Sequence, residues 1–291
     1  GLLCYKGGEN VKVNDFTFAD KTLADFNCIC CNFDNNSGMV EVGVELKLNQ
    51  EKSSGSDWFN LYSTTYDEPF TLPLSICINM CNSDIDYLTV AQARKIQKWL
   101  SLKNKKFRIN CSGYENIYWI GNFSAKQVMI NDQIIGFNLT FTANTPYALQ
   151  DDLLINCDLS ANIRETEFEI NSDKYGCINA DYIITCKEAG DLTVSSYYVD
   201  QANELLILDR QFKIDNCSMG EIITINGASQ LVTSNINGRQ LGKDCNFLLP
   251  RLINTYQDVD ETVKNRIVVN RPCTIKITYA PIAMIAYGYK G

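Results

Sequence analysis

The chain contains no histidine, so it lacks the side chain that most often acts as a general base or binds a metal. That absence excludes every mechanism in which a histidine activates a serine or a cysteine. Glycine-rich phosphate loops and the Gly-x-Ser-x-Gly motif are missing as well. The sequence thus offers no catalytic, cofactor-binding or metal-binding residues, and we expect no enzyme.

Long apolar runs are also missing, and none approaches the length of about 18 residues that predicts a membrane-spanning helix. Acidic residues outnumber basic ones by 34 to 26, which gives a formal charge of −8. No basic run is dense enough for a nucleic-acid-binding segment. We expect neither a membrane span nor sequence-specific binding to nucleic acid.

Cysteine is plentiful, but its pattern does not predict disulfides or a metal site. The 13 cysteines are odd in number and spread through both halves, whereas disulfide-rich secreted domains are short and hold even numbers. The densest group is Cys28, Cys30 and Cys31, with Cys4 as a further neighbour, and it has no second pair at zinc-binding spacing. We interpret the cysteines as reduced thiols of a protein folded in a cytoplasm.

Two pairs of adjacent carboxylates, Asp67 with Glu68 and Asp151 with Asp152, lie in turn-like segments. The paired carboxylates of glycosidases face one another across a cleft from separate strands. Sequence neighbours in a turn are more often solvated caps, so these pairs predict no hydrolase site.

The stretch from Phe70 to Asn79 gives the strongest strand signal, because apolar residues occupy every second position over ten residues. Pro73 stands at one of the positions between the alternating apolar residues, and it has no N–H to donate to a neighbouring strand. Its nitrogen is therefore expected to face a sheet edge or a bulge.

An amphipathic helix is predicted shortly after that strand. Thr89 and Gln92 fit a capping box, and the apolar residues that follow recur at helical spacing, namely Ala93, Ile96, Trp99 and Leu100. Asn104 fits the left-handed position just beyond the helix. The helix would dock on the sheet that contains the strand.

The remaining patterns of the first half also predict strands. Phe16, Phe18, Leu23 and Phe26 would anchor an N-terminal hairpin, and alternation from Val40 to Leu48 predicts a half-buried strand, followed by a polar loop over 49–56. A second hairpin is expected from Val128 to Thr142, with a turn of three residues at Asn131–Gln133. The first half is therefore predicted to be an α+β domain.

The segment Ala143–Ala148 breaks the last of these strands, and we place a domain boundary there, between residues 1–149 and 150–291. Beyond Ile163 every apolar run is short and strand-like, with turn signals at close intervals and no convincing helix. The best hairpin pairs 221–227 with 231–233. The second half is predicted to be an antiparallel β-sandwich, so the fold class is mainly β.

Taken in order, several stretches resemble the distal tail proteins of long-tailed bacteriophages that infect Gram-positive hosts. In the first half they are Cys31–Asp34, Tyr66–Leu72 with the helix ending at Leu100, Tyr114–Tyr118, Gly136–Thr142 and Asn144–Ala148. In the second half, Gly220–Ser234, Leu249–Leu252 and Asn265–Tyr279 are similar to the galectin-like C-terminal domain of that family. The cysteine content and the long stretch from Thr255 to Lys264 depart from the family pattern.

The resemblance implies a structural protein of the virion tail tip, assembled in the bacterial cytoplasm and using no cofactor. Residues 1–149 would be a belt domain, six copies of which form a ring by extending their sheets around a channel for DNA. The tail tube protein would sit above the ring and the tail-tip hub protein below it, and receptor-binding proteins are further candidate partners. Expected interface residues are Tyr66, Glu68, Pro69 and Pro73, since an open strand edge is a template for a neighbouring chain.

A carbohydrate-binding protein is the alternative function. In that interpretation the sandwich of residues 150–291 binds glycans of the host surface, and Tyr197 and Tyr198 form the stacking platform. Aromatic residues in strands are more often part of a core or an interface, and a sandwich fold alone does not give function.

Overall fold

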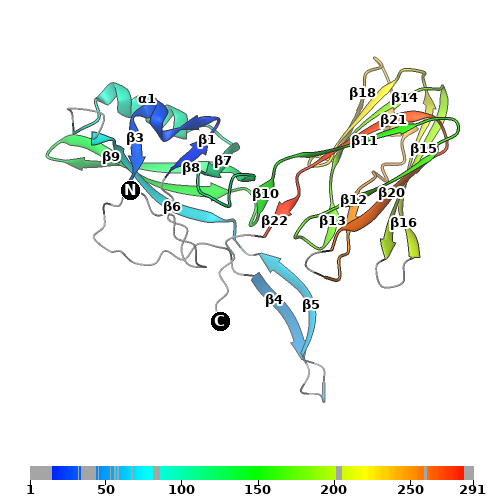
Figure 1. The fold of residues 1–291 in the computed structure, drawn as a ribbon, viewed down its shortest axis with the longest axis horizontal. Helices are drawn as coiled ribbons and strands as arrows, with labels where there is room; N and C mark the ends of the chain where they lie inside the picture. The colour runs from blue at the N-terminus through cyan, green and yellow to red at the C-terminus, as the bar shows by residue number, and fades with distance from the viewer. Residues whose placement is uncertain are drawn as a thin grey trace. The chain divides into compact units, whose positions relative to one another are not determined.

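The computed structural model describes residues 15–31, 33, 44, 46–52, 54–55, 57, 59–66, 68–80, 86–200, 205–258 and 261–284. The chain divides into two compact units: an N-terminal unit of residues 1–150 with 283–291, and a C-terminal unit of residues 151–282 (Figure 1). Antiparallel strands dominate both units, which confirms the predicted mainly-β class. No helix in the described ranges is long and apolar enough to cross a membrane.

The N-terminal unit is built on one curved antiparallel sheet that is covered by a helix (Figure 1). Its strands follow in the spatial order β2 (Lys21–Thr22), β1 (Phe16–Phe18), β7 (Lys105–Ile109), β8 (Ile117–Ile130), β9 (Gln133–Ala143), β6 (Thr71–Ile78) and β3 (Cys28–Cys30). The short strand β10 (Ala148–Gln150) pairs with β8 and with β22 (Ile282–Ala283).

Strand β6 confirms the prediction of a long strand with one buried face. Leu72, Ile76 and Ile78 are buried, whereas Thr71 and Pro73 on either side of Leu72 are exposed. The strand pairs with β9 over seven residues without a register shift. The alternating pattern of apolar residues is thus explained by one face that packs on the core and one that does not.

Helix α1 (Val90–Leu100) begins at the predicted capping box. The Gln92 backbone nitrogen donates to Thr89 Oγ1 at 3.3 Å, and the Thr89 nitrogen donates to Gln92 Oε1 at 2.9 Å. Trp99 is buried, stacks on Phe26 at a centroid distance of 4.4 Å and donates its indole N–H to the Phe18 carbonyl at 2.8 Å. Asn104 has the predicted left-handed φ of 54°, but Ser101 is the C-cap, so Asn104 serves the turn into β7.

The hairpin of β8 and β9 differs from the prediction in its turn. Ile130 pairs with Gln133, which leaves two turn residues rather than three, Asn131 at φ 49° and Asp132 at φ 62°. Two positive φ angles are typical of the type I′ turn, whose twist matches that of the paired strands. The sequence pattern also predicts one strand from Ile117 to Phe123 and a separate one from Val128, whereas β8 runs unbroken through both.

The C-terminal unit is an antiparallel sandwich of two sheets that share one core. One sheet has the order β11 (Leu153–Leu159), β21 (Cys273–Tyr279), β14 (Asp181–Cys186), β17 (Ile222–Asn226) and β18 (Leu231–Ser234). The other has the order β12 (Glu165–Ile170), β20 (Val263–Val269), β15 (Gly190–Asp200) and β16 (Leu205–Cys217). A small pair, β13 (Gly176–Ile178) with β19 (Leu252–Asn254), and a one-turn helix, α2 (Leu241–Asp244), complete it.

The core of this sandwich comes from alternate residues of the two sheets. Ile184 and Ile275 of one sheet and Val194, Phe212 and Ile267 of the other are buried in a single cluster. The predicted hairpin of β17 and β18 is confirmed, with Asn226 paired to Leu231. The helix α2 has only four residues and buries none of them, so no apolar periodicity marks it in the sequence.

Candidate functional site

The hairpin of β4 (Leu46–Lys52) and β5 (Phe59–Tyr66), here called the arm, forms a two-stranded sheet of its own (Figure 1). Within the described residues, its two strands pair only with each other. Three large apolar side chains of the arm are exposed: Leu48 by 52%, Leu61 by 54% and Tyr62 by 66%. A two-stranded hairpin alone is marginal in water, so the arm needs a further surface to become rigid.

The arm corrects the prediction for this part of the chain. The expected strand from Val40 to Leu48 begins at Leu46 among the described residues and continues to Lys52, through part of the expected loop. Leu48 was expected on a buried face and is exposed instead. Val40, Val42 and Trp58 lie outside the described residues. Alternation in the sequence shows that a strand has an apolar face, but not what covers that face.

The predicted interface residues lie at the base of the arm and along β6. Tyr66 ends β5, is half-buried and packs against the core of the N-terminal unit. Glu68, Pro69 and Pro73 are exposed. Asp67 lies outside the described residues. Tyr66, Glu68 and Pro69 thus lie at or directly after the end of the arm, and Pro73 lies within β6. The exposed side chains of the arm itself were not among the predicted interface residues.

Strand β6 pairs with β9 along one edge, and only part of its other edge, here called the outer edge, pairs with β3. Ala143 donates to the Phe70 carbonyl at 2.8 Å on the β9 side, whereas Cys31 donates to the Ser75 carbonyl at 2.9 Å on the opposite side. Because these directions alternate along a strand, Pro73 turns its nitrogen away from β9, as predicted. Strand β3 covers only Ile76–Ile78, so in the described ranges no strand pairs with the outer edge from Thr71 to Leu74.

Tyr197 and Tyr198, the expected glycan platform, are both half-buried in β15. Tyr197 lies opposite Leu208 and Tyr198 opposite Ile207 of β16. Consecutive residues of a strand point to opposite faces, so the two rings do not form one stacking surface. The geometry gives no support to a shared platform.

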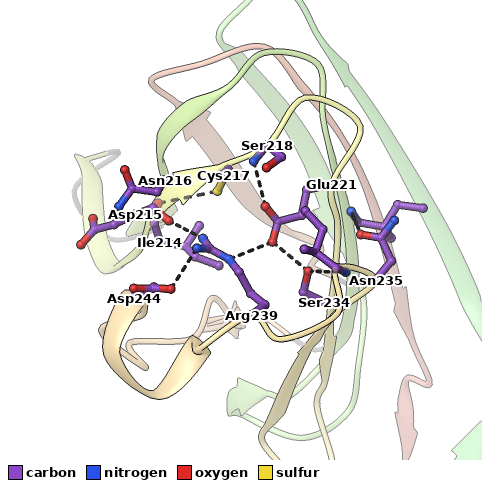
Figure 2. A network of polar contacts seen from close by, with 12 residues as sticks. Ile214, Asp215, Asn216, Cys217, Ser218, Glu221, Ser234, Asn235, Arg239 and Asp244 are labelled. Carbon is purple, nitrogen blue, oxygen red and sulfur yellow. Dashed lines mark hydrogen bonds and ion pairs between the residues drawn. The ribbon is translucent and has the colours of Figure 1, made fainter.

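A buried charge network lies in the C-terminal unit (Figure 2). Glu221 is 1% exposed and accepts hydrogen bonds from Ser218 N at 2.9 Å, Ser234 Oγ at 2.8 Å and Arg239 Nε at 3.1 Å. Arg239 also donates to Asp244 Oδ2 at 2.9 Å and to the Asp215 carbonyl. Every charged group has its partners inside the fold, so the network fastens the 235–244 segment to the sandwich rather than forming an open site.

The cysteines of the described ranges are free thiols. Burial, with a smaller effect of Cys77, raises the pKa of Cys28 to about 12, and burial is also the main cause that raises the pKa of Cys30 to about 12. Protonated thiols of this kind are poor nucleophiles and poor metal ligands. No group of three or more potential metal ligands occurs in the described part of the chain, and Cys4 lies outside it.

Two family models match consecutive parts of the chain. Residues 11–145 match the phage tail protein N-terminal domain, and residues 147–279 match the phage tail C-terminal domain. Together the two matches cover nearly the whole sequence. No curated protein matches the chain.

Solved structures of phage proteins align with the chain, and the first of them shares its fold. The Dit protein of phage SPP1, described as a paradigm of the hub adsorption apparatus in phages that infect Gram-positive bacteria, aligns with a TM-score of 0.58 at 11% identity, over 92% of this chain and 99% of that one. A chain of the phage p2 baseplate in its activated conformation with Sr aligns with a TM-score of 0.48 at 10% identity, over 95% of this chain and 100% of that one.

Proposed function

Since the chain belongs to this family of phage tail proteins, we propose that it is a non-enzymatic adaptor that forms a ring at the distal end of the tail. In this role the ring joins the tail tube above to the tail-tip hub below, and the protein resides in the virion after assembly in the host cytoplasm. The SPP1 protein supports the proposal through its shared fold.

The arm is the feature of the structure that supports this proposal most strongly. It exposes Leu48, Leu61 and Tyr62 and pairs, within the described residues, only with itself. Several large apolar side chains exposed on one short ribbon are typical of a surface that another protein covers. Among the described residues no strand pairs with the outer edge of β6 from Thr71 to Leu74, and an edge of this kind can take up a strand of a neighbouring chain.

A ring follows if the arm of one copy binds a different surface of the next copy. Such a head-to-tail contact repeats around a rotation axis and closes when the rotation fits a whole number of subunits. We propose six copies, with the N-terminal unit forming the ring around a channel for DNA and the galectin-like C-terminal unit directed outward. Tyr66, Glu68, Pro69 and Pro73 would then lie at the contact between neighbours.

Native mass measurements over a concentration series test this proposal. The expected result is a species of six times the chain mass of 32.8 kDa, which binds purified tube and hub proteins of the same phage. A folded monomer at high concentration that binds neither protein would contradict it. A monomer that forms rings only when the tube protein is present would still agree with the adaptor function and would show that the tube protein nucleates the ring.

A further inference from the structure

Helix α1 and the segment after it concentrate positive charge in an acidic protein. Between Tyr87 and Tyr114 there are seven lysine and arginine residues and no aspartate or glutamate, so all 34 acidic residues lie elsewhere in the chain. On α1 itself, Arg94, Lys95 and Lys98 lie on the exposed face and line a shallow open hollow, together with Ala91, Gln97 and Ser101.

These cations have no acidic partner in the described part of the chain. Arg94, Lys95 and Lys98 form no ion pair there, and the first turn of the helix holds no acidic residue. Lys95 lies 5.7 Å from the centroid of the Phe26 ring. Arg94 and Lys98 are four residues apart, a spacing at which like charges repel one another on a helix. An acidic group placed over the hollow would relieve that repulsion.

The surroundings of the helix favour a compact acidic partner over a nucleic acid. Eleven residues give α1 a length of about 16 Å, whereas ten base pairs of duplex extend about 34 Å. Outside the segment from Tyr87 to Tyr114 the chain holds 34 acidic and 19 basic residues, so a duplex that extends past this segment meets an excess of negative charge that repels phosphate. A membrane surface is disfavoured because Ile96, Trp99 and Leu100 of α1 are buried in the core, which leaves Val90 as the one large apolar side chain exposed on the helix.

We propose that the exposed face of α1, formed by Arg94, Lys95 and Lys98, is a docking surface for an acidic segment of another tail protein. The cations give orientation and a fast approach, since charge complementarity acts mainly on the association rate and on specificity. The proposal is independent of the arm and of the number of subunits in the ring.

The test measures fluorescence anisotropy of a labelled peptide of eight glutamates with the full chain. The R94E/K98E variant should bind at least tenfold more weakly than the wild type, and R94Q/K98Q about threefold more weakly. The control K213E/K276E makes the same charge change at exposed lysines of the C-terminal unit and should lose less than twofold. Binding by the wild type should weaken at least tenfold between 50 and 300 mM NaCl, as screening increases.

Equal losses in R94E/K98E and in K213E/K276E would overturn the proposal, because the effect would then be one of net charge. Tighter binding of a 12-base-pair duplex than of the peptide would also overturn it, in favour of nucleic acid. Circular dichroism shows whether each variant keeps its fold. If the glutamate variant unfolds, the glutamine variant decides, since glutamine is a good helix former.

Discussion

The two units of the chain differ in whether clustered basic side chains have acidic partners. In the C-terminal unit, Arg239 lies between Glu221 and Asp244, and Arg251 forms a two-pronged pair with Asp209 at 2.8 and 2.9 Å. In the N-terminal unit, the cations of α1 form no ion pair with any described residue. Charge that is satisfied within a fold stabilises it, whereas unneutralised charge on a rigid helix is available to a partner.

The two units also differ in how their sheets are supported. The sandwich covers each of its two sheets with the other and encloses one core. The N-terminal unit covers its main sheet with α1 but extends the arm, with Leu48, Leu61 and Tyr62 exposed. We therefore assign assembly to the N-terminal unit and treat the C-terminal unit as self-supporting, a distinction that the following predictions test.

The largest effect on stability is expected from Glu221→Ala. Removal of the buried carboxylate leaves Arg239, whose side chain is 12% exposed, without its main partner. The free energy of unfolding of the C-terminal unit should fall by about 3 to 5 kcal/mol in a urea titration.

The control for that change is Glu167→Ala, which breaks an exposed pair with Arg266 at 2.8 Å. This variant should lose less than about 1 kcal/mol, because exposed pairs contribute little. Similar losses in the two variants would show that the Glu221 network is not the fastening that the geometry indicates.

Trp99→Phe tests how strongly α1 is held on its sheet. The variant loses the hydrogen bond from the indole to the Phe18 carbonyl, 2.8 Å long, and leaves space beside Phe26. We expect a loss of roughly 2 to 3 kcal/mol from the unfolding free energy of the N-terminal unit. An unchanged unfolding midpoint would mean that α1 contributes little to this core.

The strand β6 and the helix α1 could be predicted from sequence because each carries its own signal. Alternation from Phe70 to Ile78 and the capping residues Thr89 and Gln92 act over a few residues and agree with the final packing. The pairing of β6 with β9 joins Thr71 to Thr142, and no local pattern encodes a contact so distant. The order of strands in the sheet therefore could not be predicted from local sequence patterns.

The exposed side chains of the candidate site could not be predicted for a different reason. Leu48 follows the same alternation as a buried residue, and only the absence of a covering layer makes it exposed. Gly55, with φ 78°, lies between the two strands of the arm and was, within the predicted polar loop, a signal for a turn there. That Tyr197 and Tyr198 do not share one face of the sheet could have been predicted from the sequence, since adjacent residues of a strand point to opposite faces.

A smaller effect is expected from alkaline pH. Burial raises the pKa of the Cys157 thiol from 9.0 to about 11, so the folded chain keeps this proton over a range in which the unfolded chain releases it. Stability should be independent of this group below pH 9 and should fall between pH 9 and 11, by about 1.4 kcal/mol per pH unit for one thiol.

Urea titrations from pH 8 to 10.5 measure this dependence in the wild type and in Cys157→Val. The valine variant removes the titrating group at similar volume, so its stability should fall less steeply with pH. Parallel slopes in the two proteins would show that Cys157 does not hold its proton in the folded state.

The central claim, that the arm is an assembly surface, is tested most directly by native mass spectrometry of Leu61→Glu beside Leu231→Glu. Both leucines lie in strands and are similarly exposed, by 54% and 59%, but Leu231 belongs to the C-terminal unit. Each variant should keep its unfolding free energy within about 0.5 kcal/mol. We predict that Leu61→Glu is monomeric at concentrations where the wild type and Leu231→Glu form rings. Rings of unchanged mass and stability in Leu61→Glu would contradict the claim.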